Sequence, residues 1–222
     1  MTRPALVFVT VLATLAPVRA QDSGTAAAQV SFRVTRFDPA DNPPPEFKAG
    51  SDAGQVDLEI PLTYIDGPFK ASLRDEQFLD FRRPGQEQPE ISVTIGPNER
   101  KGLLLVFFPE KKSFQVLKIN AAQAKLKGGD RYIFNVTASP LTVELGEAKP
   151  VLIPPKKAGI VASPPGDGVQ TLPVSIKQKD GDQWKLVSTE FWNCDPRFRK
   201  YLFVYTSPRN RRIAFHGVSE RL

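Results

Sequence analysis

The sequence predicts an all-β protein built of tandem immunoglobulin-like β-sandwiches with little helix. Three observations lead to this fold class: many short runs in which apolar and polar residues alternate, 21 prolines and 15 glycines that break these runs, and almost no segment with helical propensity. We expect strands at residues 29–37, 56–60, 62–65, 69–73, 77–81, 91–95, 103–108, 114–119, 132–137, 141–145, 151–153, 160–162, 172–177, 184–188, 201–206 and 213–217.

Three segments define the expected order of elements. Residues 132–137 and 141–145 alternate on either side of Ser139-Pro140, which predicts an antiparallel hairpin. Residues 103–108 are apolar on both faces and predict a central, buried strand. The loop at residues 39–54 contains three consecutive prolines, so it is either an exposed polyproline arm or a crossover between sheets. Residues 121–127 have helical propensity for two turns at most.

The two halves of the chain resemble each other. The matches are Pro61-Leu62-Thr63 on Pro140-Leu141-Thr142 at a shift of 79, Val93 and Ile95 on Val174 and Ile176 at 81, and Arg100-Lys101, Leu103 and Pro109 on Arg199-Lys200, Leu202 and Pro208 at 99. We therefore expect sandwich units at residues 30–120 and 130–222, related by internal duplication and joined by a linker at 121–129. A single larger sandwich also fits the pattern.

The first twenty residues predict export. Arg3 precedes an apolar run from Ala5 to Leu15, and small residues stand near Ala20, as in a secretory signal peptide. Residues 1–20 are therefore the predicted signal peptide, and residues 21–29 a flexible mature N-terminus. The mature chain is expected in the periplasm or outside the cell, with no transmembrane segment. The lone Cys194 has no partner for an internal disulfide and predicts a buried, inert thiol.

No catalytic, metal or cofactor site is predicted, because the chain lacks the motifs for them. The single histidine, His216, is expected at the surface or the rim. Asp57 and Glu59 share one strand face, which leaves a small carboxylate-based hydrolase as an alternative to a non-enzymatic role. The sequon at Asn135 lies in a predicted strand and is interpreted as coincidence.

Charge is unevenly distributed along the chain. Residues 21–100 hold 14 acids and 8 bases, whereas residues 196–222 hold 7 bases and one acid. Aromatic side chains lie among the C-terminal arginines, and this combination favours contact with an unknown protein or an anionic envelope glycan; nucleic acid is not expected as a partner. The partner-binding residues predicted from this pattern are Trp192, Arg197, Arg199, Arg209, Arg211 and Arg212. Solvated strand flanks and core packing would explain the same residues.

The sequence also resembles a known group of proteins. The segments that carry the resemblance are Gly128–Thr137, Val143–Gly146, Trp184 and Asp195–Arg199. They are similar to exported bacterial β-sandwich proteins of unassigned activity, so the resemblance implies an envelope protein without adding a catalytic residue. A weaker resemblance is to two-domain periplasmic pilus chaperones, which implies a chaperone-like assembly factor as a further alternative.

Overall fold

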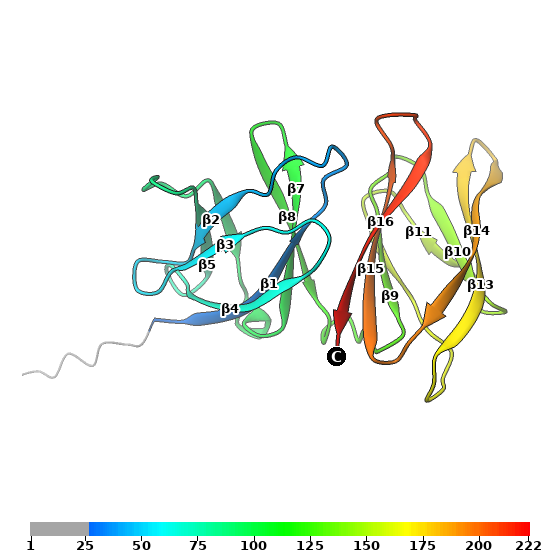
Figure 1. Ribbon diagram of the computed structural model, residues 1–222, viewed down its shortest axis with the longest axis horizontal. Helices are drawn as coiled ribbons and strands as arrows, with labels where there is room; N and C mark the ends of the chain where they lie inside the picture. Colours follow the sequence, from blue (N-terminus) through cyan, green and yellow to red (C-terminus); the bar gives the residue numbers. More distant parts are fainter. Residues whose placement is uncertain (1–26) are drawn as a thin grey trace, which may run out of the picture.

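The computed structural model describes residues 27–222, which form sixteen strands and one short 3₁₀ turn (Figure 1). The predicted signal peptide and most of the predicted mature N-terminus fall outside these residues. In the described part of the chain, no helix is long and apolar enough to cross a membrane. Residues 121–127 form turns rather than a helix, and the 3₁₀ turn lies at Pro97–Glu99.

The first eight strands form one sandwich of two four-stranded sheets. They are β1 (Gln29–Arg36), β2 (Glu46–Ala49), β3 (Val56–Glu59), β4 (Asp66–Ser72), β5 (Phe78–Arg82), β6 (Ile91–Thr94), β7 (Leu103–Glu110) and β8 (Ser113–Asn120). One sheet has the order β4-β1-β7-β8 and the other β3-β2-β5-β6. The pairing of β1 with β7 is parallel, and the other pairings are antiparallel.

The last eight strands repeat this arrangement. They are β9 (Arg131–Asn135), β10 (Leu141–Leu145), β11 (Val151–Ile153), β12 (Ala158–Val161), β13 (Gln170–Asp180), β14 (Gln183–Cys194), β15 (Phe198–Thr206) and β16 (Ile213–Arg221). Their sheets have the orders β12-β9-β15-β16 and β11-β10-β13-β14, and β9 pairs with β15 in parallel. Each strand of the second unit thus occupies the place of the strand eight positions earlier. The predicted tandem sandwiches are confirmed. The immunoglobulin-like description holds for the architecture, and each unit has eight strands divided equally between its two sheets.

The strand order corrects two of the three sequence matches. Pro61 follows β3, whereas Leu141 begins β10, which is the equivalent of β2, so the shift of 79 is wrong. The shift of 81 is wrong too, because it places β6 on β13, the equivalent of β5. The shift of 99 places β7 on its true equivalent, β15. Alternating strands match one another in many registers, which explains the two errors.

The two sandwiches pack against each other, so that four sheets form successive layers (Figure 1). Each unit has its own core, and a third cluster joins the sheet that contains β7 to the sheet that contains β15. As predicted, β7 is buried on both faces: Leu103 and Leu105 point into the first core, whereas Leu104 and Val106 belong to the joining cluster. Phe37, Phe108 and Phe203 pack together in that cluster with ring centroids 5.3 to 5.7 Å apart.

Buried polar groups at the same interface connect the units. Glu220, 8% exposed, accepts a 2.6 Å hydrogen bond from the Tyr201 hydroxyl and lies 3.4 Å from Arg199. Arg33 of the first unit donates to the other carboxylate oxygen of Glu220. Burial and the neighbouring Glu220 carboxylate both raise the pKa of Tyr201, so its hydroxyl stays protonated and donates. One carboxylate therefore ties a side chain of the first unit to two of the second.

The predicted central hairpin is wrong. β9 and β10 are consecutive, but they lie in opposite sheets and do not pair with each other. Asn135 fixes the corner between them: its side-chain amide donates to the carbonyls of Ser139 at 2.9 Å and Ile153 at 3.0 Å, and its oxygen accepts from Thr137. Asn135 is fully buried, which agrees with the interpretation of its sequon as coincidence. Alternation alone does not tell a hairpin from two strands that face each other across a core.

Other strands also differ from the prediction. The strand predicted at residues 62–65 is wrong, because these residues form an irregular connection between β3 and β4. β2 was missed because it has only four residues and follows three prolines, although Phe47 and Ala49 alternate as buried residues within it. Its position makes the Pro-rich loop a crossover between sheets, with Pro43 and Pro44 exposed. β14 was predicted to end at Ser188 but continues to Cys194, so Trp192 lies in a strand rather than in a loop.

Candidate functional site

The structure separates the predicted partner-binding residues into three environments. Arg197 and Arg199 lie at the start of β15, and Arg209, Arg211 and Arg212 lie in the loop that follows it. β15 has nine residues, which at about 3.3 Å per residue places the two groups roughly 26 Å apart. Trp192 lies in the opposite sheet. The six residues therefore do not form a single site.

Trp192 is not a surface platform for stacking. It is 7% exposed and belongs to the core of the second unit. The guanidinium carbon of the buried Arg131 lies 4.2 Å from the centre of its ring, close enough for a cation–π contact. The prediction that Trp192 meets a partner at the surface therefore needs correction, because its indole face is occupied from within the molecule.

Arg197 and Arg199 have acidic partners in the molecule. Arg197 forms an ion pair with Asp195 at 2.7 Å, and the hydrogen bonds from Arg197 lower the pKa of Asp195 to about 2. The same carboxylate raises the pKa of Arg197. Arg199 lies 3.4 Å from Glu220 at the interface between the units. Both positive charges are partly neutralised, which weakens their attraction for an external anion.

The loop at residues 207–212, which we call the arginine loop, presents its charges to solvent. Arg209, Arg211 and Arg212 are exposed and take part in no ion pair within the described residues. The loop backbone is fixed by two hydrogen bonds between Ser207 and the chain at Arg211 and Arg212, at 2.9 and 2.8 Å. Arg211 adopts a positive φ of 59°. Three arginine side chains thus extend from an ordered turn.

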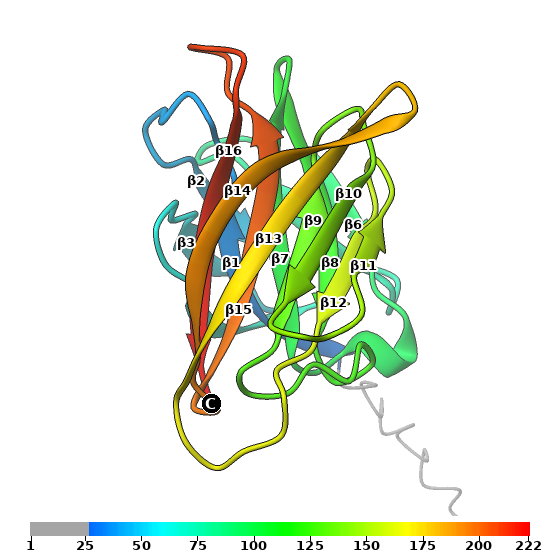
Figure 2. The same ribbon diagram turned by 90° about the vertical axis from the view of Figure 1, so that its right-hand side faces the viewer.

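The first unit carries bases on the equivalent hairpin, between β7 and β8. Lys111 and Lys112 are exposed there and also have no ion pair within residues 27–222. Both loops lie at the same end of the molecule in two perpendicular views, with the β1–β2 loop beside them (Figures 1 and 2). We call these five bases the cationic end. The shift of 99 aligns Lys112 with Arg211, so a comparison of the two halves of the sequence could have identified these lysines as candidate binding residues.

The β1–β2 loop near the cationic end is held in place by buried groups. Arg36, 3% exposed, lies 3.6 Å from Asp38 and donates to the carbonyls of Asn42 and Pro43. Asp38 in turn accepts a 2.9 Å bond from the backbone of Ala40. This part of the surface therefore has a defined shape, formed around a neutralised charge pair.

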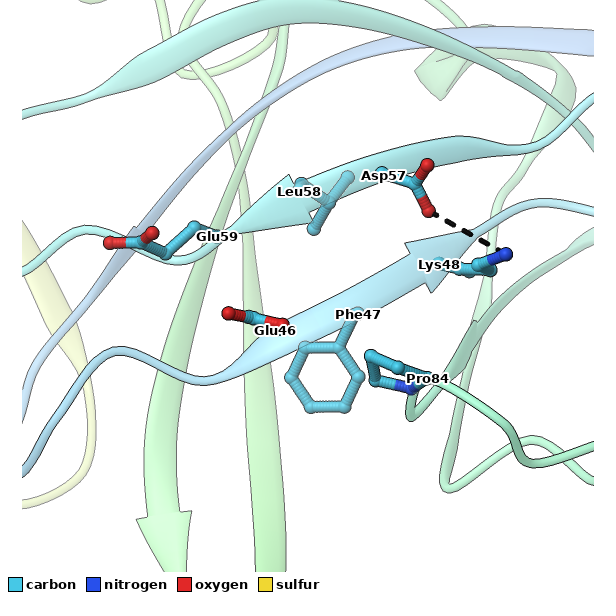
Figure 3. A pocket seen from close by; sticks show the side chains of 7 residues that line it. All are labelled: Glu46, Phe47, Lys48, Asp57, Leu58, Glu59 and Pro84. Carbon is cyan, nitrogen blue, oxygen red and sulfur yellow. Dashed lines mark ion pairs between the residues drawn. The ribbon is translucent and has the colours of Figure 1, made fainter.

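The carboxylates of the hydrolase alternative lie in a shallow hollow of about 330 Å³ on strands β2 and β3 (Figure 3). Asp57, with an 84% exposed side chain, points to Lys48 at 4.0 Å, whereas Glu59 points away from it (Figure 3). Glu46 is paired with Glu59 in the strand register. A glycosidase needs two carboxylates that face a common substrate atom. Asp57 and Glu59 do not converge in this way.

An outward apolar surface on β14 was not expected. The register between β13 and β14 shifts next to Val187, so Trp184 and Leu186 face the same side as Phe191. Their exposed fractions are 41%, 62% and 72%. Sequence alternation missed this surface because a one-residue bulge exchanges the two faces of a strand.

His216 and Cys194 have buried polar atoms. His216 is half-buried rather than at the surface, because the face of β16 that carries it packs against the first unit, with its ring 5.9 Å from Phe37. Burial lowers the pKa of His216, and the charge of Arg36 lowers it further.

Cys194 is buried, as predicted. The described residues contain no group of three or more histidine, cysteine, aspartate or glutamate side chains placed to hold a metal ion.

Three features of the described surface bear on function. Five exposed bases without ion pairs in the described residues lie at one end, three exposed apolar side chains share one face of β14, and the acids of the hydrolase alternative point apart. No family model matches this chain, and no curated protein matches it in sequence.

Proposed function

We propose that this chain is an exported, non-catalytic protein of the periplasm or cell envelope that binds an anionic envelope glycan through its cationic end. One observation carries the proposal: five exposed bases on two equivalent loops take part in no ion pair within the described residues. Charges without internal partners raise the local concentration of an anionic ligand and direct its approach. An ordered arginine loop also loses little conformational freedom on binding.

The test compares two triple variants of the mature protein. The first changes Arg209→Ser, Arg211→Asn and Arg212→Ser, since asparagine tolerates the positive φ at position 211. The matched control removes three exposed lysines outside the cationic end, Lys101→Gln, Lys127→Gln and Lys149→Gln. The probe is polygalacturonate, a carboxylated polysaccharide, titrated calorimetrically at low and at high NaCl.

We expect the arginine-loop variant to bind roughly 100-fold more weakly, because each of its three bases contributes about 1 kcal/mol near an anionic surface. The control should lose much less, and high salt should weaken the unmodified protein most. Equal losses in both variants, or binding that salt does not affect, would refute the proposal.

A second candidate function is binding of a protein partner, as a chaperone-like factor would require. The observation in its favour is the outward apolar surface of Trp184, Leu186 and Phe191 on β14, an edge strand that pairs only with β13 within the described residues. Edge strands accept added strands, and exposed apolar side chains supply contact area. Envelope proteins crosslinked to the unmodified chain should be lost with Trp184→Ser and Phe191→Ser, but kept with the arginine-loop variant. The opposite pattern would exclude this candidate.

A further inference from the structure

A pocket of about 250 Å³ opens at one edge of the second sandwich, at the opposite end of β15 from the arginine loop. It lies between the edge strands β14 and β16, which belong to opposite sheets of the unit and both contribute lining residues. Arg131, Trp192, Lys200 and Ser219 are among its lining residues. We call it the Arg131 pocket. It is separate from the cationic end that carries the proposed function.

Arg131 is a buried cation without a carboxylate partner. It is 3% exposed, and it forms no ion pair within residues 27–222. Its Nη1 donates to Cys194 Sγ at 3.3 Å, and its Nη2 donates to the Asn193 carbonyl at 3.0 Å. Neither acceptor is a carboxylate, and only two of its five N–H groups are used in these bonds. A buried charge is costly without a counter-charge, so this site lacks a carboxylate or phosphate partner.

Lys200 adds a second positive charge beside the first. It is the register partner of Arg131 in the parallel pairing of β15 with β9, so both side chains project from the same face of the sheet. Burial lowers the pKa of Lys200, and the charge of Arg131 lowers it further. The neighbouring acid, Asp195, forms its ion pair with Arg197 at 2.7 Å, and its charge also raises the pKa of Lys200. Two cations therefore share the pocket, and the acid beside Lys200 holds its hydrogen bonds with Arg197.

A second hollow adjoins the pocket. It has a volume of about 310 Å³, and Lys200 and Ser219 line both spaces. Asn193, Asp195 and Phe198 line the second hollow, which gives it polar, acidic and apolar contacts for the body of a ligand. An anionic head group at Arg131 and Lys200 could thus continue into space for an attached group.

We propose that the Arg131 pocket binds an oxyanion, a carboxylate or a phosphate group, between Arg131 and Lys200. A guanidinium matches either group with paired N–H donors, and Lys200 supplies a mobile second donor. The indole of Trp192 fixes Arg131 from one side, so the donors are in place before the ligand arrives. This ligand is distinct from the polyanion expected at the cationic end.

The experiment uses Trp192 as its own reporter. The chain has two tryptophans, so Trp184→Phe leaves Trp192 alone in the mature protein. Sodium phosphate and sodium acetate are titrated separately, with NaCl holding the ionic strength constant, and fluorescence and Tm are measured. A bound ligand stabilises the folded state in proportion to the logarithm of its concentration. We expect a saturable fluorescence change and a rise in Tm with one anion or with both.

Lys200→Gln is then compared with Lys101→Gln, the matched change at the equivalent position of the first unit, where the lysine is exposed. Loss of one charged hydrogen bond should weaken anion binding roughly 10- to 100-fold in Lys200→Gln and leave it unchanged in Lys101→Gln. A response to phosphate alone identifies a phosphate group, and a response to acetate alone a carboxylate. No saturable change with either anion, or the same loss in both lysine variants, overturns the proposal.

Discussion

The two sandwich units bury their charges differently. In the first unit, Asp80 is fully buried and accepts bonds from Arg74 at 2.7 Å and Ser92 at 2.6 Å, with Arg82 at 3.6 Å. In the second unit, Arg131 is 3% exposed, and among the described residues its guanidinium contacts a carbonyl, a thiol and an indole ring. With Leu103 matched to Leu202, the strand register places Val30 at the position of Arg131. The repeated fold therefore does not need the arginine.

This difference indicates which buried charge is structural and which is available to a ligand. Burial alone would raise the pKa of Asp80, but the bonds from Arg74 and Ser92 and the charge of Arg82 outweigh it and lower the pKa. Asp80 is thus held as a neutralised ion on the face of β5 opposite to Leu79 and Phe81, which point into the core of the first unit. Arg131 has no such compensation within the described chain. Conserved strand order does not imply equal function.

The largest expected effect on the free energy of unfolding follows removal of Asp80, the buried and neutralised acid of the first unit. Asp80→Ala leaves Arg82 without its buried partner and should lower the free energy of unfolding by about 3 kcal/mol. The matched control is Asp75→Ala, which removes an exposed acid from the same Arg74 and should cost less than about 1 kcal/mol. Urea unfolding followed by far-ultraviolet circular dichroism measures both. Equal costs would mean that Asp80 is no more structural than a surface acid.

A second variant tests whether the units depend on each other. Glu220→Ala removes the carboxylate shared by Arg33, Arg199 and Tyr201, and should destabilise the protein by about 2 kcal/mol because the Tyr201 hydroxyl stays buried without an acceptor. Both tryptophans lie in β14, so their fluorescence reports the second unit, whereas circular dichroism reports both. We expect the two midpoints to separate in this variant. Coincident midpoints would show that the apolar cluster alone couples the units.

A third variant removes the buried positive charge that distinguishes the second unit from the first. Arg131→Met replaces the uncompensated cation by an apolar side chain, as Val30 is in the first unit. The free energy of unfolding should change by no more than about 1 kcal/mol, because burying a charge offsets much of what its contacts contribute. The rise in Tm with phosphate or acetate should disappear. A loss of several kcal/mol, or a retained anion response, would make Arg131 a structural residue instead.

The sequence predicts those parts of the fold that depend on local pattern. The run from Leu103 to Phe108 identified a strand buried on both faces, and the shift of 99 identified its repeat. The turn between β9 and β10 was misassigned, because pairing is decided by partners far along the chain, here the bonds of Asn135 to Ser139 and Ile153. Residues 1–26 fall outside the described structure, so export stays a prediction.

The candidate sites were less predictable than the fold. Arginines in the loop after β15 were identified from composition, but their separation from Arg197 and Arg199 depends on the length of a strand and on acids such as Glu220. The isolation of Arg131 could not be inferred, since nothing in the sequence states which charges lack a partner. The exposed surface of β14 depended on one bulge next to Val187.

The smallest expected effect concerns His216, the only histidine of the chain, which lies where the two units meet. Its Nε2 atom is buried and has no hydrogen-bond partner among the described residues. Burial of the ring beside Phe37 and Phe203 disfavours its charged form and outweighs a backbone hydrogen bond at Leu62 that raises the pKa of His216. The folded protein therefore binds a proton less readily than the unfolded chain, whose histidine has a pKa of 6.5. The contribution of neutral His216 to stability is therefore fully present above pH 6.5, and it is lost as the pH falls through the lowered pKa that His216 has in the folded protein.

Measurement of the free energy of unfolding from pH 7 down to about pH 5, before most carboxylates titrate, isolates this contribution. His216→Phe keeps an aromatic ring between Phe37 and Phe203 and removes the titratable group, so its stability should be nearly constant over this range. The unmodified protein should lose stability on acidification, while Arg131→Met, which alters the second core alone, should keep the full pH dependence. If the free energy of unfolding of His216→Phe depended on pH as steeply as that of the unmodified protein, the pH dependence would arise from groups within the units rather than from His216 at their interface.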